Sequence, residues 1–252
     1  MRRKKLFQSE RTMEYDYIVS KEQPLSFVAE AFQKTLVNIE YVNVDGNLKV
    51  LQFTSSLAGA GKTTFVSNLA YLIGKKGKKV VIVDLDLRKP KINRIFKAPN
   101  ENGLTDYLAG RVKYEELVQF SESLHTHFIV AGERTTAVVN VLETQKLKDL
   151  IARLRQEFDY VLVDAPPVIA VSDALYIARI TDAVIFVVAQ NEAKRSIIND
   201  ALKTLKQNDV NVIGTVFTQV DSRGNEMYAY TYGYEYGYNS TGDDKLDQSI
   251  KK

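Results

Sequence analysis

Cysteine and tryptophan are absent from this 252-residue sequence, which also holds only two histidines and five prolines. The lack of cysteine excludes disulfide bonds, thiolate metal sites and iron–sulfur clusters, and it suits a reducing cytosol. The sequence also has no large excess of positive or negative charge, because it contains 34 basic and 31 acidic residues and its net charge is +3. This near balance argues against a dedicated nucleic-acid binder, so we expect no nucleic-acid partner.

Long hydrophobic runs are also lacking. No stretch reaches the roughly 18 consecutive apolar residues that a membrane-spanning helix needs. The basic start MRRKK is followed by the polar segment FQSERTMEYDY, without the apolar core of a signal peptide. We therefore expect neither a membrane span nor a targeting segment.

The sequence divides into three parts by composition. Residues 1–24 are a polar lead-in that ends at Pro24, and residues 25–217 hold most of the apolar runs. Residues 218–252 are polar, dotted with glycine and rich in tyrosine, and we interpret them as a flexible tail. The middle part is long enough to bury the core of one domain.

Short apolar runs alternate with helical patterns along this middle part. Ser26 is a candidate N-cap for a helix that begins near residue 27. The runs at 50–53, 80–83, 160–163, 183–189 and 210–217 are β-branched, as expected of buried parallel strands. Helical spacing is found at 63–74, where Gly74 is the predicted end, and at 143–157, 172–180 and 195–208. This alternation predicts a doubly wound, mostly parallel α/β sheet flanked by helices.

The segment TSSLAGAGKTT at 54–64 joins the first strand to the helix that follows it. Strand, glycine loop, lysine, threonine and helix in this order are typical of a phosphate-binding P-loop, although Ser56 replaces its usual first glycine. Lys62 would reach the β- and γ-phosphates of a nucleotide, and the Thr63 hydroxyl would ligate Mg²⁺. The predicted ATP-binding residues are Ala58, Gly59, Ala60, Gly61, Lys62, Thr63 and Thr64.

Aspartates follow two of the other buried runs. VVIVDLDLRKP places Asp84 and Asp86 after one run, and YVLVDAPP places Asp164 after another. Ligands of open α/β sheets bind outside the carboxyl ends of the strands, where these side chains would meet the P-loop. Three carboxylates there repel one another without a cation, so Mg²⁺ held by Thr63, Asp86 and Asp164 is expected. A single Asp after a strand is more often a turn former or a helix cap.

Together these segments resemble the bacterial tyrosine kinase (BY-kinase) family of polysaccharide co-polymerase systems, in particular its stand-alone cytoplasmic members from Gram-positive capsule and exopolysaccharide operons. The resemblance covers about residues 28–238 and includes SSLAGAGKTT, VVIVDLDLRKP, GLTDYLAG, DYVLVDAPP and the terminal tyrosines. It implies a P-loop NTPase fold and an autophosphorylating protein-tyrosine kinase that uses ATP and Mg²⁺. The catalytic residues implied are Lys62, Asp84, Asp86 and Asp164.

The resemblance also implies partners and a location. These are a membrane-embedded activator of the co-polymerase type, a homo-oligomer and a cognate tyrosine phosphatase, with the kinase cytoplasmic and peripheral at the inner face of the plasma membrane through its partner. The family's Glu-x-x-Arg-x-x-Arg assembly motif is only partly present, because Gln33 and Leu36 follow Glu30. The alternatives are a structural adaptor or a non-kinase ATPase switch related to partitioning and septum-positioning ATPases. Those ATPases carry an early-loop lysine where this chain has Leu57.

Six tyrosines stand at every second position near the C-terminus, namely Tyr228, Tyr230, Tyr232, Tyr234, Tyr236 and Tyr238. On an edge strand all six would share one face, but the glycines between them weaken a strand. A tail of phosphoacceptors explains the pattern better. The 11 residues from Phe217 to Tyr228 extend to roughly 36 Å, far enough to enter a neighbouring protomer's site. We expect transfer in trans, with Asp84 accepting the tyrosine proton.

Arg88 and the two histidines leave alternatives open. Arg88 stands two residues past Asp86, where contact with phosphate and pairing with an acid are equally expected. His125 and His127 are spaced to share one face, as in a metal site, but no third ligand is apparent. Ordinary surface positions are the favoured interpretation for both histidines.

Overall fold

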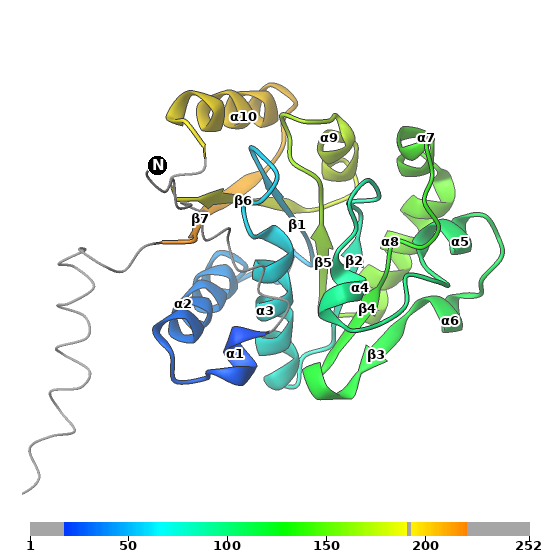
Figure 1. The fold of residues 1–252 in the computed structure, drawn as a ribbon, viewed down its shortest axis with the longest axis horizontal. Helices are drawn as coiled ribbons and strands as arrows, with labels where there is room; N and C mark the ends of the chain where they lie inside the picture. Colours follow the sequence, from blue (N-terminus) through cyan, green and yellow to red (C-terminus); the bar gives the residue numbers. More distant parts are fainter. Residues whose placement is uncertain (1–17, 191–192, 221–252) are drawn as a thin grey trace, which may run out of the picture. The chain divides into compact units, whose positions relative to one another are not determined.

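A seven-stranded sheet is the centre of the computed structural model, which describes residues 18–190 and 193–220 (Figure 1). Its strand order is β3-β4-β2-β5-β1-β6-β7, and within the described residues the β3–β4 pair alone is antiparallel. The predicted doubly wound, mostly parallel sheet is confirmed. The strands are β1 (Val50–Ser55), β2 (Val80–Asp84), β3 (Gln119–Ser121), β4 (Thr126–Ile129), β5 (Tyr160–Asp164), β6 (Ala183–Ala189) and β7 (Val212–Thr218).

Burial explains why most strands lack an alternating pattern in the sequence. Every residue of β1, β2 and β6 is buried, because helices cover both faces of these strands. The edge strand β7 is half-buried or exposed along its length. The short pair β3 and β4 was not among the predicted strands, since three or four residues are too few to show a period.

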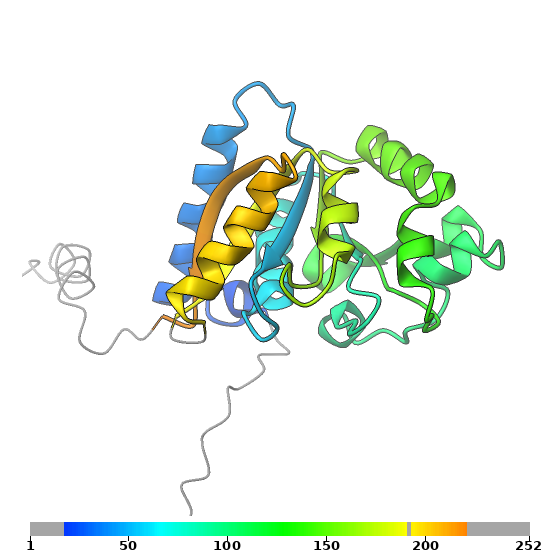
Figure 2. The same cartoon turned by 90° about the horizontal axis from the view of Figure 1, so that it is seen from above.

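Helices form a layer on each face of the sheet (Figures 1 and 2). One layer contains α1 (Val19–Glu22), α2 (Phe27–Val42), α3 (Lys62–Lys75) and α4 (Ile92–Ile95). The other contains α8 (Gln145–Glu157), α9 (Asp173–Ala178) and α10 (Arg195–Gln207), and shorter helices complete the connections at α5 (Leu104–Leu108), α6 (Tyr114–Leu117) and α7 (Val138–Leu142). Of the helices that the structure describes, none is long and apolar enough to cross a membrane.

Helix boundaries agree with the sequence at some points and differ at others. Ser26 caps α2 as predicted, because its Oγ accepts a 3.2 Å hydrogen bond from the Ala29 N–H. Gly74 does not end α3. A Cβ at Gly74 would lie 2.0 Å from the His125 carbonyl oxygen, so glycine is needed there for close packing. Within the predicted lead-in of residues 1–24, Val19 of α1 is buried.

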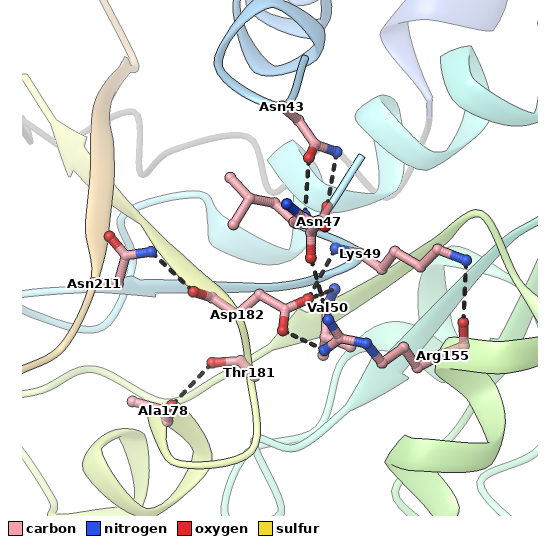
Figure 3. Close-up of polar contacts among 10 residues, drawn as sticks. Asn43, Asn47, Lys49, Val50, Arg155, Ala178, Thr181, Asp182 and Asn211 are labelled. Carbon is pink, nitrogen blue, oxygen red and sulfur yellow. Dashed lines mark hydrogen bonds and ion pairs between the residues drawn. The ribbon is translucent and has the colours of Figure 1, made fainter. Parts of the chain in front are cut away.

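Asp182 precedes β6 and forms hydrogen bonds with the residues at the start of β1 (Figure 3). Its Oδ2 accepts the N–H groups of Lys49 and Val50, each at 2.8 Å, and Oδ1 pairs with Arg155. The Asn211 side-chain amide donates to the Asp182 carbonyl at 2.9 Å. These bonds hold the start of β1 next to the start of β6, and the glycine loop follows the other end of β1.

Candidate active site

The loop between β1 and α3 turns sharply because its glycines adopt left-handed backbone conformations. Gly59 has φ of 91° and Gly61 has φ of 76°, values that residues with a side chain rarely adopt. Ser56, at the position of the missing first glycine, is buried, so its small side chain fits. The loop leads into the N-terminus of α3, whose first amide groups have no acceptor within the helix and therefore suit an anion.

The other predicted nucleotide-binding positions of the loop differ in exposure. Ala58 is exposed, Ala60 is buried and Thr64 is half-buried in the first turn of α3. Lys62 is the first residue of that helix and is only 7% exposed. Its Nζ donates to Ser55 Oγ at 3.2 Å, a contact at the end of β1 that sequence reasoning did not identify.

Lys62 carries a buried cation at the end of the sheet. Burial lowers its pKa, and the carboxylates of Asp164 and Asp86 oppose that shift. An anion placed beside Lys62 would compensate the cost of burying its charge. The side chain is therefore positioned to bind a phosphate group near the two aspartates.

Asp164 lies at the end of β5, between β2 and β1. Its Oδ2 accepts a 2.5 Å hydrogen bond from the Thr63 hydroxyl, which joins the strand to the first turn of α3. Its Oδ1 is buried and has no hydrogen-bond partner among the described residues. Burial raises the pKa of Asp164 to about 6, although Lys62 and the Thr63 hydrogen bond oppose the rise.

Asp84 pairs with Asp164 in the register of β2 and β5, so these two aspartates are the last residues of neighbouring strands and lie side by side. Asp84 is fully buried and both of its oxygens are engaged. Oδ2 accepts the N–H groups of Lys91 and Ile92 at 3.0 Å, and Oδ1 accepts the N–H of Asp86 at 3.2 Å. Burial and the nearby Asp164 raise the pKa of Asp84. These bonds hold the connection between β2 and α4.

Asp86 and Arg88 lie on that connection. Asp86 is half-buried, and its Oδ1 accepts the Lys89 N–H at 3.1 Å. Burial raises the pKa of Asp86, whereas the charge of Lys62 opposes that rise. Of the two roles expected for Arg88, the structure shows pairing with an acid. Its guanidinium binds both oxygens of the buried Asp173, at 2.7 and 3.0 Å.

Sequence reasoning missed Asp173, because an aspartate beside a serine at a helix start is more typical of a cap. The surface position expected for both histidines is found for one of them. His127 packs between the rings of Phe120 and Phe158, with centroids 4.6 and 5.0 Å away, and His125 is exposed. The six tail tyrosines predicted as phosphoacceptors lie outside the described residues.

The chemistry of the donor set decides whether magnesium fits here. Across the part of the chain that the structure describes, no three His, Cys, Asp or Glu side chains form a metal-binding group. Mg²⁺ needs no such cage, because it is usually bound by one or two carboxylates together with waters and substrate phosphates. The Thr63 hydroxyl and the unsatisfied Asp164 Oδ1 are oxygen donors of that kind. The residues present therefore fit the ion.

The chain is similar to known proteins over most of its length. The tyrosine-protein kinase YwqD of Bacillus subtilis is 28% identical over 221 residues, which are 88% of this chain and 93% of the relative. CapB of Staphylococcus aureus, named as a putative tyrosine-protein kinase, is 26% identical over 84% of this chain and 93% of its own length. A putative tyrosine-protein kinase from the cps region of Klebsiella pneumoniae is longer, and the chain spans 29% of it.

Solved structures agree with this grouping. The chimerical protein CapA2B2 superposes with a TM-score of 0.78 at 26% identity, covering 81% of this chain and 90% of that one. The kinase domain of the Escherichia coli tyrosine kinase ETK gives 0.79 at 24% identity over 82% of each chain. A septum site-determining MinD from Pyrococcus horikoshii shares the fold with a TM-score of 0.57 at 24% identity, over 67% of this chain and 69% of that one. The relatives named as tyrosine-protein kinases do not favour the alternative relationship to such ATPases.

A family model described as an AAA domain (AAA_31) matches residues 48–213, which is more than half of the sequence. That range includes the P-loop and all three aspartates discussed above. The resemblance to bacterial tyrosine kinases that the sequence motifs indicated is confirmed by the named relatives. The chain belongs to the AAA_31 family of AAA domains.

Proposed function

We propose that this protein is an autophosphorylating protein-tyrosine kinase that transfers the γ-phosphate of ATP to its C-terminal tyrosines. One observation carries the proposal: directly after the glycine loop, the buried Lys62 contacts the end of β1 and Thr63 binds Asp164 at the end of the adjacent parallel strand β5. Relatives named tyrosine-protein kinases support the choice of this activity over other uses of ATP. The chain would act in capsular or exopolysaccharide biosynthesis or export, as the cps region of one relative suggests.

ATP would bind with its phosphates in the loop that runs from Ala58 to Thr64. The backbone amides of the loop and the Lys62 ammonium are the groups that would neutralise the β- and γ-phosphates. Thr63 and Asp164 would hold Mg²⁺, whereas Asp86, the third ligand predicted from the sequence, is given a different role below. When bound, Mg²⁺ supplies positive charge that stabilises the phosphate oxygens during transfer.

The tyrosine hydroxyl must lose a proton as its oxygen attacks the γ-phosphorus, because its ordinary pKa is near 10. Asp84 was our sequence-based choice for the acceptor. Its oxygens already accept three backbone N–H groups and are shielded from solvent, which suits a structural role. We therefore assign proton acceptance to Asp86, which lies on the same connection after β2 and is only half-buried.

Partners follow from the same proposal. A membrane-embedded activator of the co-polymerase type would regulate the kinase, which would act at the inner face of the plasma membrane through it. Transfer between protomers of a homo-oligomer would bring tail tyrosines to a neighbour's site. A cognate tyrosine phosphatase would reverse the modification. Leu36 stands where the family's assembly motif has its second arginine, and it is buried in the core. We therefore do not propose that this position contacts a neighbouring protomer.

Incubation of the purified protein with ATP and Mg²⁺, followed by mass spectrometry, tests the activity. We expect phosphate on tyrosines between residues 228 and 238, and none after the substitution Lys62→Met, which removes the buried cation. A non-kinase ATPase would release free phosphate without modifying the tail, and an adaptor would do neither. Either of these results contradicts the proposal.

A further inference from the structure

The last residue of β7 contacts the phosphate loop from the edge of the sheet. The Thr218 hydroxyl donates a 2.7 Å hydrogen bond to the carbonyl oxygen of Ala60. A second acceptor, the Val188 carbonyl, lies farther away at 3.4 Å. The shorter contact links two segments that are distant in the sequence. Thr218 is the first residue of the tail predicted from composition, but it lies in β7.

The backbone of Thr218 is held in place by the sheet. Its carbonyl accepts the Gln190 N–H at 2.9 Å, and Thr218 is the register partner of Ala189 at the end of β6. The hydroxyl is therefore presented to the loop from a fixed strand end. The side chain also lies alongside Gly61, because a Cβ built there would be 3.7 Å from the Thr218 Cβ and Oγ1 atoms.

Because the peptide bond is planar, a contact at the Ala60 carbonyl also fixes the direction of the Gly61 N–H. The Ala60–Gly61 peptide is trans, as are all peptides in the described residues, so its C=O and N–H point in opposite directions. Holding the Ala60 oxygen on Thr218 therefore directs the Gly61 N–H away from β7. Gly61 has φ of 76°, and a glycine peptide can rotate between conformations more easily than others. A fixed partner for this carbonyl removes that freedom.

We infer that Thr218 is a positioning residue for nucleotide phosphates, which acts by fixing the orientation of the Ala60–Gly61 peptide. It does not touch the nucleotide itself in this role. Its hydroxyl keeps one loop amide oriented before the phosphates arrive, so that binding costs less conformational entropy. This inference rests on the nucleotide binding in the proposed function, and it adds a residue from β7 to a site otherwise built by β1, β2, β5 and α3.

Three variants test the inference. Thr218→Val removes the hydroxyl and keeps the shape of the side chain, whereas Thr218→Ser keeps the hydroxyl. Thr215→Val is the matched control, because Thr215 is an exposed threonine on the same strand. Calorimetric titration with ADP and Mg²⁺ gives the affinity, steady-state kinetics give KM and kcat for ATP, and thermal melting monitors folding. Titrations are run well below the melting temperature of each variant.

We expect Thr218→Val to weaken ADP binding and to raise KM by about 2- to 10-fold, the effect of one neutral hydrogen bond. The value of kcat should change little, because ground state and transition state lose the same interaction. Thr218→Ser and Thr215→Val should bind as the unaltered protein does. Equal affinity of the valine and unaltered proteins overturns the inference, as does a serine variant that binds as poorly as the valine variant. Failure of the unaltered protein to bind ADP would instead contradict the proposed function.

Discussion

The Thr63 hydroxyl donates a 2.5 Å hydrogen bond to Asp164 Oδ2, while the other oxygen of the same carboxylate is buried with no partner in the described part of the chain. A buried carboxylate with one unsatisfied oxygen costs free energy unless another group compensates it. Lys62 supplies part of the compensation through its charge. A cation bound by Thr63 and Asp164 would supply the rest, and this leads to the first prediction.

We predict that Asp164→Asn and Thr63→Val remove the magnesium dependence of nucleotide binding. In the unaltered protein, chelation of Mg²⁺ should weaken ADP binding, because the phosphates then lose a shared cation. Each variant should bind ADP about 10- to 100-fold more weakly in Mg²⁺ and respond little to chelation. Titration calorimetry with and without a chelator measures both effects. Thr204→Val serves as the control and should keep the full response, because Thr204 is half-buried on α10 and its hydroxyl donates to the Asp200 carbonyl of the same helix.

Substitution of Asp84 and of Asp86 by asparagine should have different effects, one on stability and the other on catalysis. Asp86→Asn should lower kcat for tail phosphorylation by about 10²- to 10⁴-fold, the usual contribution of a general base, and leave ADP affinity unchanged. Asp84→Asn should lower the free energy of unfolding by about 1–3 kcal/mol, because an amide nitrogen would face backbone N–H groups. Urea denaturation and single-turnover kinetics measure the two effects.

The opposite pattern would contradict this assignment of roles. A stable Asp84→Asn protein without kinase activity would restore Asp84 as the proton acceptor. Loss of ADP affinity in Asp86→Asn would instead make Asp86 a magnesium ligand, as the sequence predicted.

Arg88 and Asp173 should contribute to stability as a pair. Because Asp173 is 1% exposed, Arg88→Ala leaves a buried carboxylate without its bidentate partner, and we expect a loss of about 1–3 kcal/mol in the free energy of unfolding. The double variant Arg88→Ala/Asp173→Ala should lose less than the sum of the single variants. The exposed pair Arg153–Glu157 should contribute less than the Arg88–Asp173 pair, because solvent screens its charges. Additive losses at Arg88 and Asp173 would show that the pair is not coupled.

The sequence predicted the layered fold and the place where the loop and aspartates converge, because both depend on local patterns. Buried parallel strands give continuous apolar runs, and parallel strands carry their following residues to one edge of the sheet. Glycine, lysine and threonine at fixed spacing then locate the loop. These features need no knowledge of contacts between distant residues.

Contacts across the fold were not predictable in the same way. Thr218 meets Ala60, and Asp173 meets Arg88, only after β7 and α9 have packed against other elements. Gly74 looked like a helix end, because nothing in the sequence shows that the His125 carbonyl approaches it. The sequence alone also does not show the three backbone N–H groups that donate to Asp84, on which our proposed reassignment of the proton acceptor depends.

His127 should make stability depend on pH between about 7.5 and 5.5. Burial among aromatic rings lowers the pKa of His127 below its ordinary value of 6.5, and the nearby Lys79 adds to the shift, although a hydrogen bond with the Val80 backbone opposes it. The unfolded chain therefore binds a proton at this residue at a higher pH than the folded protein does. Its contribution to stability is present above pH 6.5 and is lost as the pH falls through the lower folded-state pKa.

Replacing His127 with phenylalanine should remove this part of the pH dependence, since the ring contacts with Phe120 and Phe158 are kept and the titrating group is lost. Urea unfolding at about pH 7.5, 6.5 and 5.5 measures the slope of stability against pH for each protein. His125→Phe is the control, because His125 is exposed, and it should keep the slope of the unaltered protein. If His127→Phe and the unaltered protein lose stability equally over this range, the slope arises from other groups and His127 is not its source.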